Sequence, residues 1–245
     1  MSSERQELNE ISPWWGEHVH RYNEVIKQLK GNENVLDIAC GTGFGSNLLA
    51  SKIDGNIIGG DLSAETIELC KNSWNANNLT FQVMDGTQLK FEDNAFDVVV
   101  SFETIEHTTA FNEMITEFKR VTKKGGKLFI STPNKLINSP SGVVTNPYHT
   151  QEWYYKEFVE LLDAHFEKYQ LFGQKYTRYK NGGIGEKVEN VLYKRGLRKI
   201  PITIQDKIMG AFGQPSMYPT DLDYEMVTDS EEILKCKTFF LRVDV

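Results

Sequence analysis

Short apolar runs alternate with amphipathic stretches through the first half of the chain, and this alternation constrains the fold more than any other feature. Five runs are expected to be strands, at residues 34–39, 56–61, 79–85, 96–103 and 127–134. Stretches between them have the spacing of helices, at residues 46–53, 63–78 and 111–123. Strands that are apolar throughout and are joined by helices indicate a parallel sheet that is covered on both faces.

The remaining sequence adds elements at both ends of this core. A helix is expected over 14–30 and another over 150–166, and strands are expected at 167–176 and at 236–245. Residues 180–220 contain glycines and prolines and show no clear strand. The sequence therefore predicts an α/β fold with a doubly wound, mostly parallel sheet of seven strands, helices on both faces and a helical insertion before the last strand.

A glycine-rich turn, DIACGTGFG, follows the first expected strand. Such a turn lets a ligand approach the backbone, and the next helix offers free N–H groups. The Gly-Lys-Ser/Thr of a phosphate-binding loop is absent, which disfavours nucleoside triphosphate hydrolysis. The dinucleotide pattern G-x-G-x-x-G also fails, because Gly41 and Gly43 are followed by Ser46 at its third position. A structural turn without any ligand remains an alternative.

Three carboxylates recur in phase with the strands. Asp61 follows Asp37 by 24 residues, and Asp85 follows Asp61 by the same number, which is about the length of one strand–helix unit. All three carboxylates are therefore expected at the same edge of the sheet. A carboxylate at Asp61 can accept hydrogen bonds from two ribose hydroxyls, and one at Asp85 can accept from an exocyclic amine. An acid near the glycine turn repels pyrophosphate and favours an ammonium group. The pattern indicates a cationic ligand that contains adenosine, rather than a dinucleotide.

Four segments, VLDIACGTGFGS, IIGGDLS, VMDGTQL and FDVVVSFETIEH, closely resemble the successive motifs of class I S-adenosylmethionine-dependent methyltransferases. The resemblance covers about residues 30 to 165. It implies a Rossmann-like fold, with Asp37 and the glycines around the methionine part, Asp61 at the ribose and Leu62 against adenine. The implied cofactor-binding set is Asp37, Gly41, Gly43, Asp61, Leu62, Asp85, Gly86 and Phe102.

The sequence pattern also predicts three parts of the chain. Residues 1–30 are expected to form an N-terminal helical lid over the cofactor. Residues 31–175 and 226–245 are expected to form the S-adenosylmethionine-binding domain. Residues 176–225 are then an inserted substrate or lid segment, because loops over this edge of a sheet carry substrate choice.

A second group of polar residues follows the fourth expected strand. If FETIEHT is helical, Glu103, Glu106 and His107 point the same way, and His149 lies in a loop that opens on the same edge. Four such ligands, Glu103, Glu106, His107 and His149, suit Mg²⁺ or Mn²⁺. Alternatively His107, His149 and Glu103 are catalytic without a metal, His107 or His149 serving as a general base. Plainer roles also exist: cofactor contact, pairing with a lysine, or helix capping.

The E-x-x-E-H element adds a further resemblance. It is similar to ubiquinone-pathway O-methyltransferases and to small-RNA 3′-terminal 2′-O-methyltransferases, which place a metal there. HVHRY at 18–22, taken with FETIEH, resembles bacterial methyltransferases encoded near glycan or secondary-metabolite genes.

The expected reaction is methyl transfer to a hydroxyl of a small molecule, such as a sugar, a glycan precursor or a secondary metabolite. The sulfonium methyl is already activated, so positioning and removal of the hydroxyl proton are what the site must supply. N-methylation of a small amine, carbon methylation, an NAD-binding oxidoreductase and a cofactor-binding relative without catalysis remain alternatives.

Composition narrows the partners and the compartment. The net charge of −7 makes long nucleic acid an unexpected partner, since phosphate binding needs clustered Lys and Arg. No apolar run approaches the ~20 residues of a membrane span, and no secretory signal is evident. Three scattered cysteines fit a reducing cytoplasm. We expect a cytoplasmic monomer or homodimer that binds a small-molecule acceptor.

Overall fold

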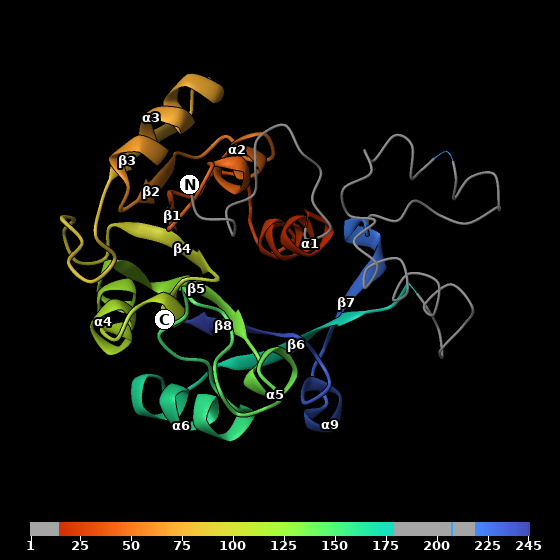
Figure 1. Cartoon of the computed structure of the whole chain (residues 1–245). Helices are drawn as coiled ribbons and strands as arrows, with labels where there is room; N and C mark the ends of the chain where they lie inside the picture. Colours follow the sequence, from red (N-terminus) through yellow and green to blue (C-terminus); the bar gives the residue numbers. More distant parts are fainter. Residues whose placement is uncertain (1–14, 179–206, 208–218) are drawn as a thin grey trace.

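The central sheet sets the position of every candidate residue named above. The structure, a computed structural model, describes residues 15–178, 207 and 219–245. Within them the sheet has eight strands in the order β3-β2-β1-β4-β5-β8-β6-β7 (Figure 1). Five are parallel: β1 (Val35–Ile38), β2 (Ile57–Asp61), β3 (Leu79–Val83), β4 (Phe96–Phe102) and β5 (Thr122–Pro133). The antiparallel strands are β8 (Thr238–Asp244), β6 (Gln170–Tyr176) and β7 (Tyr224–Val227).

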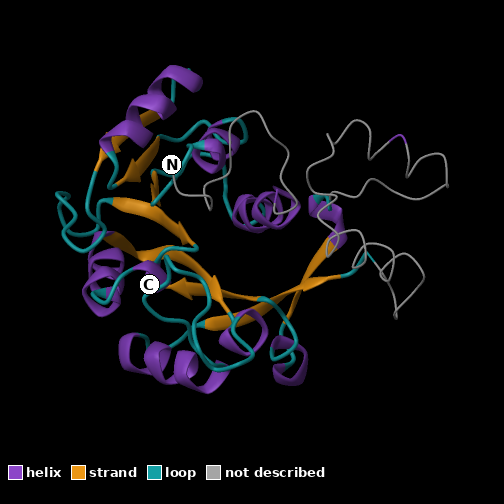
Figure 2. Cartoon of the chain, in the orientation of Figure 1, coloured by secondary structure: helices purple, strands orange, loops and turns teal. Residues whose placement is uncertain are grey.

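Helices cover both faces of the sheet (Figure 2). One face carries α1 (Trp15–Ile26), α2 (Phe44–Ala50) and α3 (Ala64–Ser73). The other carries α4 (Phe111–Val121) and α6 (Tyr155–His165). Shorter helical turns follow strands or precede them: η1 (Ile105–His107), α5 (Lys135–Asn138), η3 (Asp221–Asp223) and α9 (Ser230–Ile233).

Successive residues of the central strands point to opposite faces, and both faces are buried. Val98 and Val100 of β4 belong to the same apolar cluster as Tyr22 of α1. Val99, between them, belongs to the cluster that contains Ile115 of α4. This burial on both sides is why the strands are apolar throughout. The predicted α/β fold, Rossmann-like with helices on both faces of a mostly parallel sheet, is confirmed.

The predicted number of seven strands is wrong, because the described residues form a sheet of eight. The additional strand, β7, lies in 224–227, next to the region where the sequence shows no clear strand. It has four residues, none of whose side chains is fully buried, and among the described strands it pairs with β6 alone, at the edge of the sheet. Such an edge strand needs no apolar run, so it cannot be recognised from the sequence pattern. Most of the predicted insertion at 176–225 lies outside the described residues.

Strand β5 also begins earlier than predicted, at Thr122. The helix expected over 111–123 ends at Val121, and Gly125 and Gly126 lie inside the strand, where Gly125 has a φ of 78°. The register against β4 shifts between Phe96 and Val98, so these glycines form an irregularity in the strand pair.

Helix α1, the described part of the predicted lid, packs on the core. Tyr22 and Val25 are buried in the cluster that also contains Leu49 of α2. A side chain at Gly45 would overlap the ring of Tyr22, so this glycine permits the two helices to approach closely. The helix therefore brings its polar residues to a fixed place above the sheet.

Candidate active site

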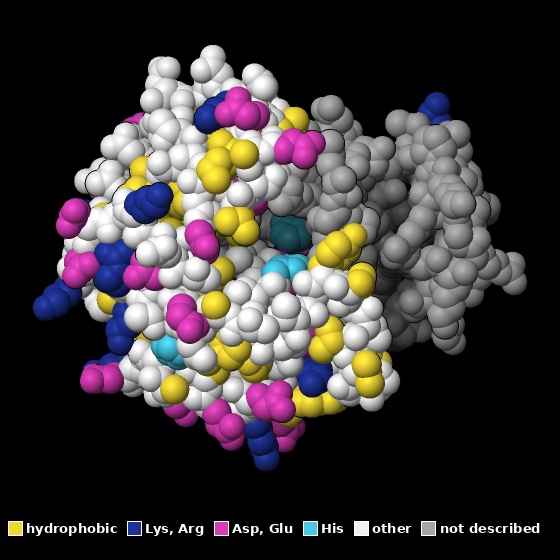
Figure 3. Space-filling model, turned by 60° about the vertical axis from the view of Figure 1, so that its left-hand side comes forward, with side chains coloured by type: hydrophobic (Ala, Val, Ile, Leu, Met, Phe, Trp, Pro, Cys, Tyr) yellow, Lys and Arg dark blue, Asp and Glu magenta, His cyan; other side chains and the backbone are white. Residues whose placement is uncertain are grey.

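A cavity of about 980 Å³ lies at the edge where the parallel strands end. On the surface it lies in a hollow with histidine side chains inside (Figure 3). We call one part of its lining the strand-end half; it includes Gly41, Thr42, Asp61, Leu62, Met84, Asp85, Gly86 and Phe102. The other part, the histidine half, includes His18, Glu103, His107, Asn138, Asn146, Tyr148, His149, Glu152 and Lys237.

The glycine turn is fixed by contacts to α3 and β2. Gly41 and Gly43 have φ values of 54° and 74°, which favour glycine. The Gly41 N–H donates to Asp61 Oδ2 at 3.2 Å, and its carbonyl accepts from the Cys70 thiol at 3.1 Å. The Trp74 indole donates to the Thr42 carbonyl at 2.8 Å. These hydrogen bonds hold the turn in place where Gly41 and Thr42 line the cavity.

The strand-end half offers acceptors with an exposed apolar side chain between them. Asp61 Oδ1 accepts from the Ser63 N–H at 2.9 Å. Asp85 is exposed, and its Oδ1 accepts from Thr87 N–H at 2.8 Å and Thr87 Oγ1 at 2.7 Å. Leu62 is 72% exposed, although it is apolar. Two oriented carboxylates and an exposed leucine thus line this part of the cavity, and their roles toward ribose and adenine stay predictions.

Asp37 and Gly43 do not line the cavity, which differs from the prediction. Asp37 is 1% exposed; it accepts from Tyr22 Oη at 3.0 and 3.2 Å and from Ser46 Oγ at 2.6 Å. Burial raises the pKa of Asp37 to about 6. Its carboxylate therefore joins α1 and α2 to β1, and its place beside the methionine part of a cofactor stays a prediction. The contact with Tyr22 could not be predicted, because Tyr22 approaches from another helix.

Glu103 does not share a face with Glu106 and His107, because the expected helix is only one 3₁₀ turn that begins at Ile105. The φ of Glu103 is 51°, which turns its side chain aside. Its Oε1 accepts from Ser131 Oγ at 2.7 Å. Glu103 still lines the cavity, where the two halves meet.

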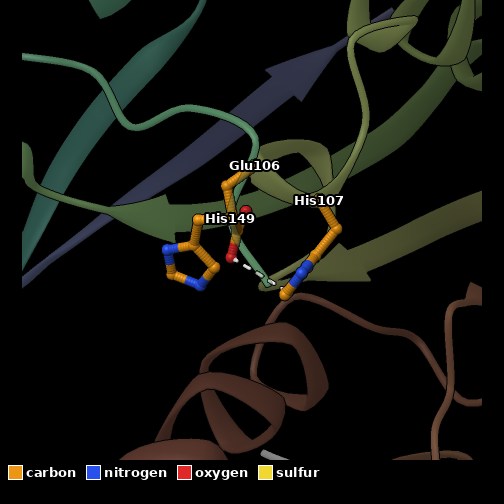
Figure 4. A group of neighbouring side chains, drawn as sticks. All are labelled: Glu106, His107 and His149. Atoms are coloured by element: carbon orange, nitrogen blue, oxygen red, sulfur yellow. Dashed lines mark ion pairs between the residues drawn. The ribbon is translucent and has the colours of Figure 1, made fainter. Parts of the chain in front are cut away.

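Glu106, His107 and His149 converge, as Figure 4 shows. One potential ligand atom from each lies within 4.8 Å of the others, and Glu103 is not in this group. The two imidazole rings are 4.9 Å apart between centroids. Glu106 is fully buried, Thr132 Oγ1 donates to its Oε2 at 3.0 Å, and its Oε1 has no hydrogen-bond partner among the described residues. Burial, with the nearby Glu103 charge, raises the pKa of Glu106 well above its usual range.

Hydrogen bonds fix which nitrogen of His107 carries the proton. A carbonyl oxygen only accepts, so His107 Nδ1 donates to the Tyr148 carbonyl at 3.0 Å. The lone pair is therefore on Nε2, which lies 3.9 Å from Glu106 Oε1. This geometry presents His107 as a base or as a metal ligand.

His149 is oriented by residues that the sequence interpretation did not single out. Asn146 Oδ1 accepts from the Tyr148 N–H at 3.0 Å, so Asn146 Nδ2 donates to His149 Nε2 at 2.9 Å. His149 Nδ1 then donates to Glu152 Oε1 at 2.8 Å. Glu152 is buried and follows His149 by three residues, and the H-x-x-E spacing was the available signal.

Two residues of the HVHRY segment also reach the site. Arg21 is fully buried, and its Nη1 donates to Gln174 Oε1 at 2.8 Å and lies 3.9 Å from Glu103 Oε1. Its Nη2 lies 2.9 Å from His18 Nδ1. The sequence shows a histidine and an arginine three residues apart in an expected helix, but it does not show which strands these side chains face.

The comparisons with known proteins agree with this geometry. Residues 36–130 match the family described as a methyltransferase domain. A probable S-adenosylmethionine-dependent methyltransferase of Mycolicibacterium smegmatis is 31% identical over 168 residues, which cover 68% of this chain and 64% of that protein. The structure of YcgJ from Bacillus subtilis superposes with a TM-score of 0.60 at 17% identity, covering 92% of this chain and 97% of that one. The chain belongs to the class I S-adenosylmethionine-dependent methyltransferases, a family of enzymes.

Two more relatives match over shorter segments. Phosphoethanolamine N-methyltransferase 1 of Arabidopsis thaliana is 34% identical over 115 residues, 46% of this chain and 23% of that protein. The ubiquinone biosynthesis O-methyltransferase of Pelagibacter ubique is 31% identical over 129 residues, 52% of each protein. Family membership implies S-adenosylmethionine as the cofactor. In the described part of the chain, no helix has both the length and the apolar character of a membrane span.

Proposed function

We propose that this protein transfers the methyl group of S-adenosylmethionine to a hydroxyl of a small molecule. The observation that carries the proposal is that His107 and His149, which line the same cavity as Asp61 and Asp85, converge with the buried Glu106. Binding of adenosine explains the strand-end acids, but it needs no pair of imidazoles beside a buried carboxylate. The added groups suit removal of a proton from the acceptor.

In this proposal the strand-end half binds the cofactor. Asp61 accepts hydrogen bonds from the ribose hydroxyls, Leu62 covers adenine and Asp85 accepts from its amine. Gly41 and its neighbours face the methionine part. Phe102 and Glu103 lie where the two halves of the cavity meet, and the methyl group would meet the acceptor there.

The histidine half activates the acceptor. The Oε1 atom of Glu106 and the Nε2 atom of His107 are both suited to Mg²⁺ or Mn²⁺, and the unpartnered buried oxygen fits such an ion. We propose Glu106, His107 and His149 as its ligands, with Glu103 adding negative charge nearby. For this, His149 Nε2 would have to bind the ion in place of the Asn146 amide from which it accepts. A bound divalent cation would lower the pKa of a coordinated hydroxyl. Glu152 and the Tyr148 carbonyl hold the two imidazoles in place.

The test is a screen of hydroxyl compounds with mass detection of products that have gained CH₂. Each acceptor is assayed with a chelator, and again after Mg²⁺ or Mn²⁺ is restored. Loss and recovery of turnover support the metal-assisted form. Turnover that is unaffected by the chelator supports His107 or His149 as a base without a metal.

N-methylation is the second candidate, because the Arabidopsis relative is an N-methyltransferase by name and is 34% identical over the matched segment. Small amines are therefore included in the same screen. Products methylated only on nitrogen, from amines that carry no hydroxyl, would replace the proposed O-methylation.

A further inference from the structure

The HVHRY segment of α1 places a polar side chain in the histidine half that neither cofactor binding nor proton removal uses. His18 lines the cavity, as does Lys237, the residue before β8. The neighbouring residue Glu17 pairs with Lys237 Nζ at 3.5 Å, which joins the two segments. Strand β8 lies beside β5, on the far side of β4 from β1 and β2. His18 and Lys237 are therefore separated from Asp61 and Asp85 by the width of several strands.

The protonation of His18 follows from its partner. A guanidinium can only donate, so Arg21 Nη2 donates to His18 Nδ1 across 2.9 Å. Nδ1 must then be unprotonated, and the single proton of the neutral ring is on Nε2. Burial and the positive charges of Arg21 and Lys237 lower the pKa of His18 well below its usual value, which keeps the ring neutral. Nε2–H makes no hydrogen bond within residues 15–178 and 219–245.

His18 Nε2–H and the Lys237 ammonium both only donate, so together they match an oxygen that only accepts. We propose that they bind a carboxylate or phosphate group of the acceptor, at a distance from the hydroxyl that is methylated. This inference rests on the proposed function, because it describes the substrate class of the same cavity.

The surrounding charges allow an anion at this place. Two described negative groups lie close to the pair: Glu17, which is ion-paired with Lys237, and Glu103, which lies 3.9 Å from Arg21, the partner of His18. Each glutamate thus faces a cation, and the neutral N–H of His18 adds a donor without an opposing charge. Oxygens that bear charge make stronger hydrogen bonds than neutral ones, so an anionic group gains more here than a hydroxyl does.

The test measures binding by calorimetry to enzyme saturated with S-adenosylhomocysteine, in a chelator so that no cation at Glu106 can hold the anion. The probes are matched pairs: 3,4-dihydroxybenzoate and its methyl ester, glycerate and glyceramide, glycerol phosphate and glycerol. We expect the anion of at least one pair to bind about tenfold more tightly than its neutral partner. Comparison among the pairs separates a carboxylate from a phosphate.

The variants distinguish a binding role from a structural one. His18→Leu and Lys237→Met are expected to reduce the preference for the anion to about threefold or less. His18→Gln should retain it, because its amide oxygen can accept from Arg21 while its amide nitrogen donates into the cavity. Lys175→Met is the matched control, since Lys175 pairs with Glu225 and Glu232 and does not line the cavity.

Two results would overturn the inference: no pair in which the anion binds more tightly, or a preference that survives in both His18→Leu and Lys237→Met. If His18→Leu fails to fold, Lys237→Met decides, because the Lys237 side chain is 41% exposed and its loss leaves α1 intact. Binding of S-adenosylhomocysteine is recorded in the same titrations. Its failure would count against the proposed function, whereas its success without an anion preference would count against this inference alone.

Discussion

The two halves of the cavity are built in different ways. In the strand-end half the residues follow successive strands, and Asp61 and Asp85 each accept a hydrogen bond from a backbone N–H two residues further along the chain. In the histidine half the residues come from widely separated segments, and side chains hold one another, as Thr132 holds the neighbouring Glu106. The difference fits the proposed function, in which the first half binds one cofactor and the second half, assembled by tertiary packing, carries the chemistry and the choice of acceptor.

The largest effect should come from breaking the histidine half alone. Glu106→Gln and His107→Ala are each expected to lower turnover about 10³-fold, because each removes a group that acts on the acceptor proton. Affinity for S-adenosylhomocysteine should stay within about twofold, since neither residue contacts the strand-end acids. Turnover by mass detection and affinity by calorimetry measure the two properties separately.

Glu113→Gln, an exposed acid in the first turn of α4, is the control and should change neither property. Equal losses of turnover and cofactor affinity in Glu106→Gln would contradict the separation of the two halves.

The next effect concerns stability, at the carboxylate that joins α1 to the core. Burial raises the pKa of Asp37 from 3.8 to about 6 in the folded protein. The folded state therefore holds this proton more tightly than the unfolded state, and folding stability falls as pH rises from about 4 to 6. The loss approaches about 3 kcal/mol above that range.

Asp37→Asn removes this titration. The free energy of unfolding of the variant, relative to the unchanged protein, should rise by about 3 kcal/mol between pH 4 and 7. Urea denaturation at several pH values measures the difference. A difference independent of pH would show that Asp37 does not titrate in this range.

The strand-end half could be predicted from the sequence because its residues are local. Asp61, Leu62, Asp85 and Gly86 follow strands that are apolar runs, and their place at one edge follows from the parallel order of the sheet. The same reasoning could not predict the burial of Asp37, since a strand-end carboxylate can also accept hydrogen bonds from another element, here from Tyr22.

The histidine half could be predicted only in part. His107 and His149 were expected to lie close together, because each follows one of two neighbouring strands at the same edge of the sheet. Their ring centroids are 4.9 Å apart. His18 and Lys237 were not expected there, since no local pattern shows that α1 and the start of β8 cover the same cavity. Strand β7 was missed for a similar reason: its pairing with β6, rather than its own composition, makes it a strand.

A smaller effect is expected in the strand-end half. Asp61→Ala should weaken S-adenosylmethionine binding by roughly 1–3 kcal/mol, because charged hydrogen bonds to the ribose are lost. Calorimetry on the folded variant measures it. Asp61 also accepts from the Gly41 N–H, so Asp61→Asn, which keeps an acceptor there, is the companion variant. Unchanged affinity in both folded variants would remove Asp61 from the ribose site.

The smallest effect should come from an apolar side chain at the same edge. Leu62 is 72% exposed, and an exposed leucine beside Asp61 is explained if adenine covers it. Leu62→Ala should weaken S-adenosylhomocysteine binding by about 1 kcal/mol, roughly fivefold, through the apolar area no longer buried on binding. The melting temperature without ligand should not change, because the side chain contributes little to the core. Leu222→Ala is the matched control: Leu222 is 86% exposed and does not line the cavity, so neither quantity should move. Equal affinities for the Leu62→Ala and Leu222→Ala proteins would mean that adenine does not contact Leu62. The carboxylates of Asp61 and Asp85 would then remain as the proposed cofactor contacts of the strand-end half.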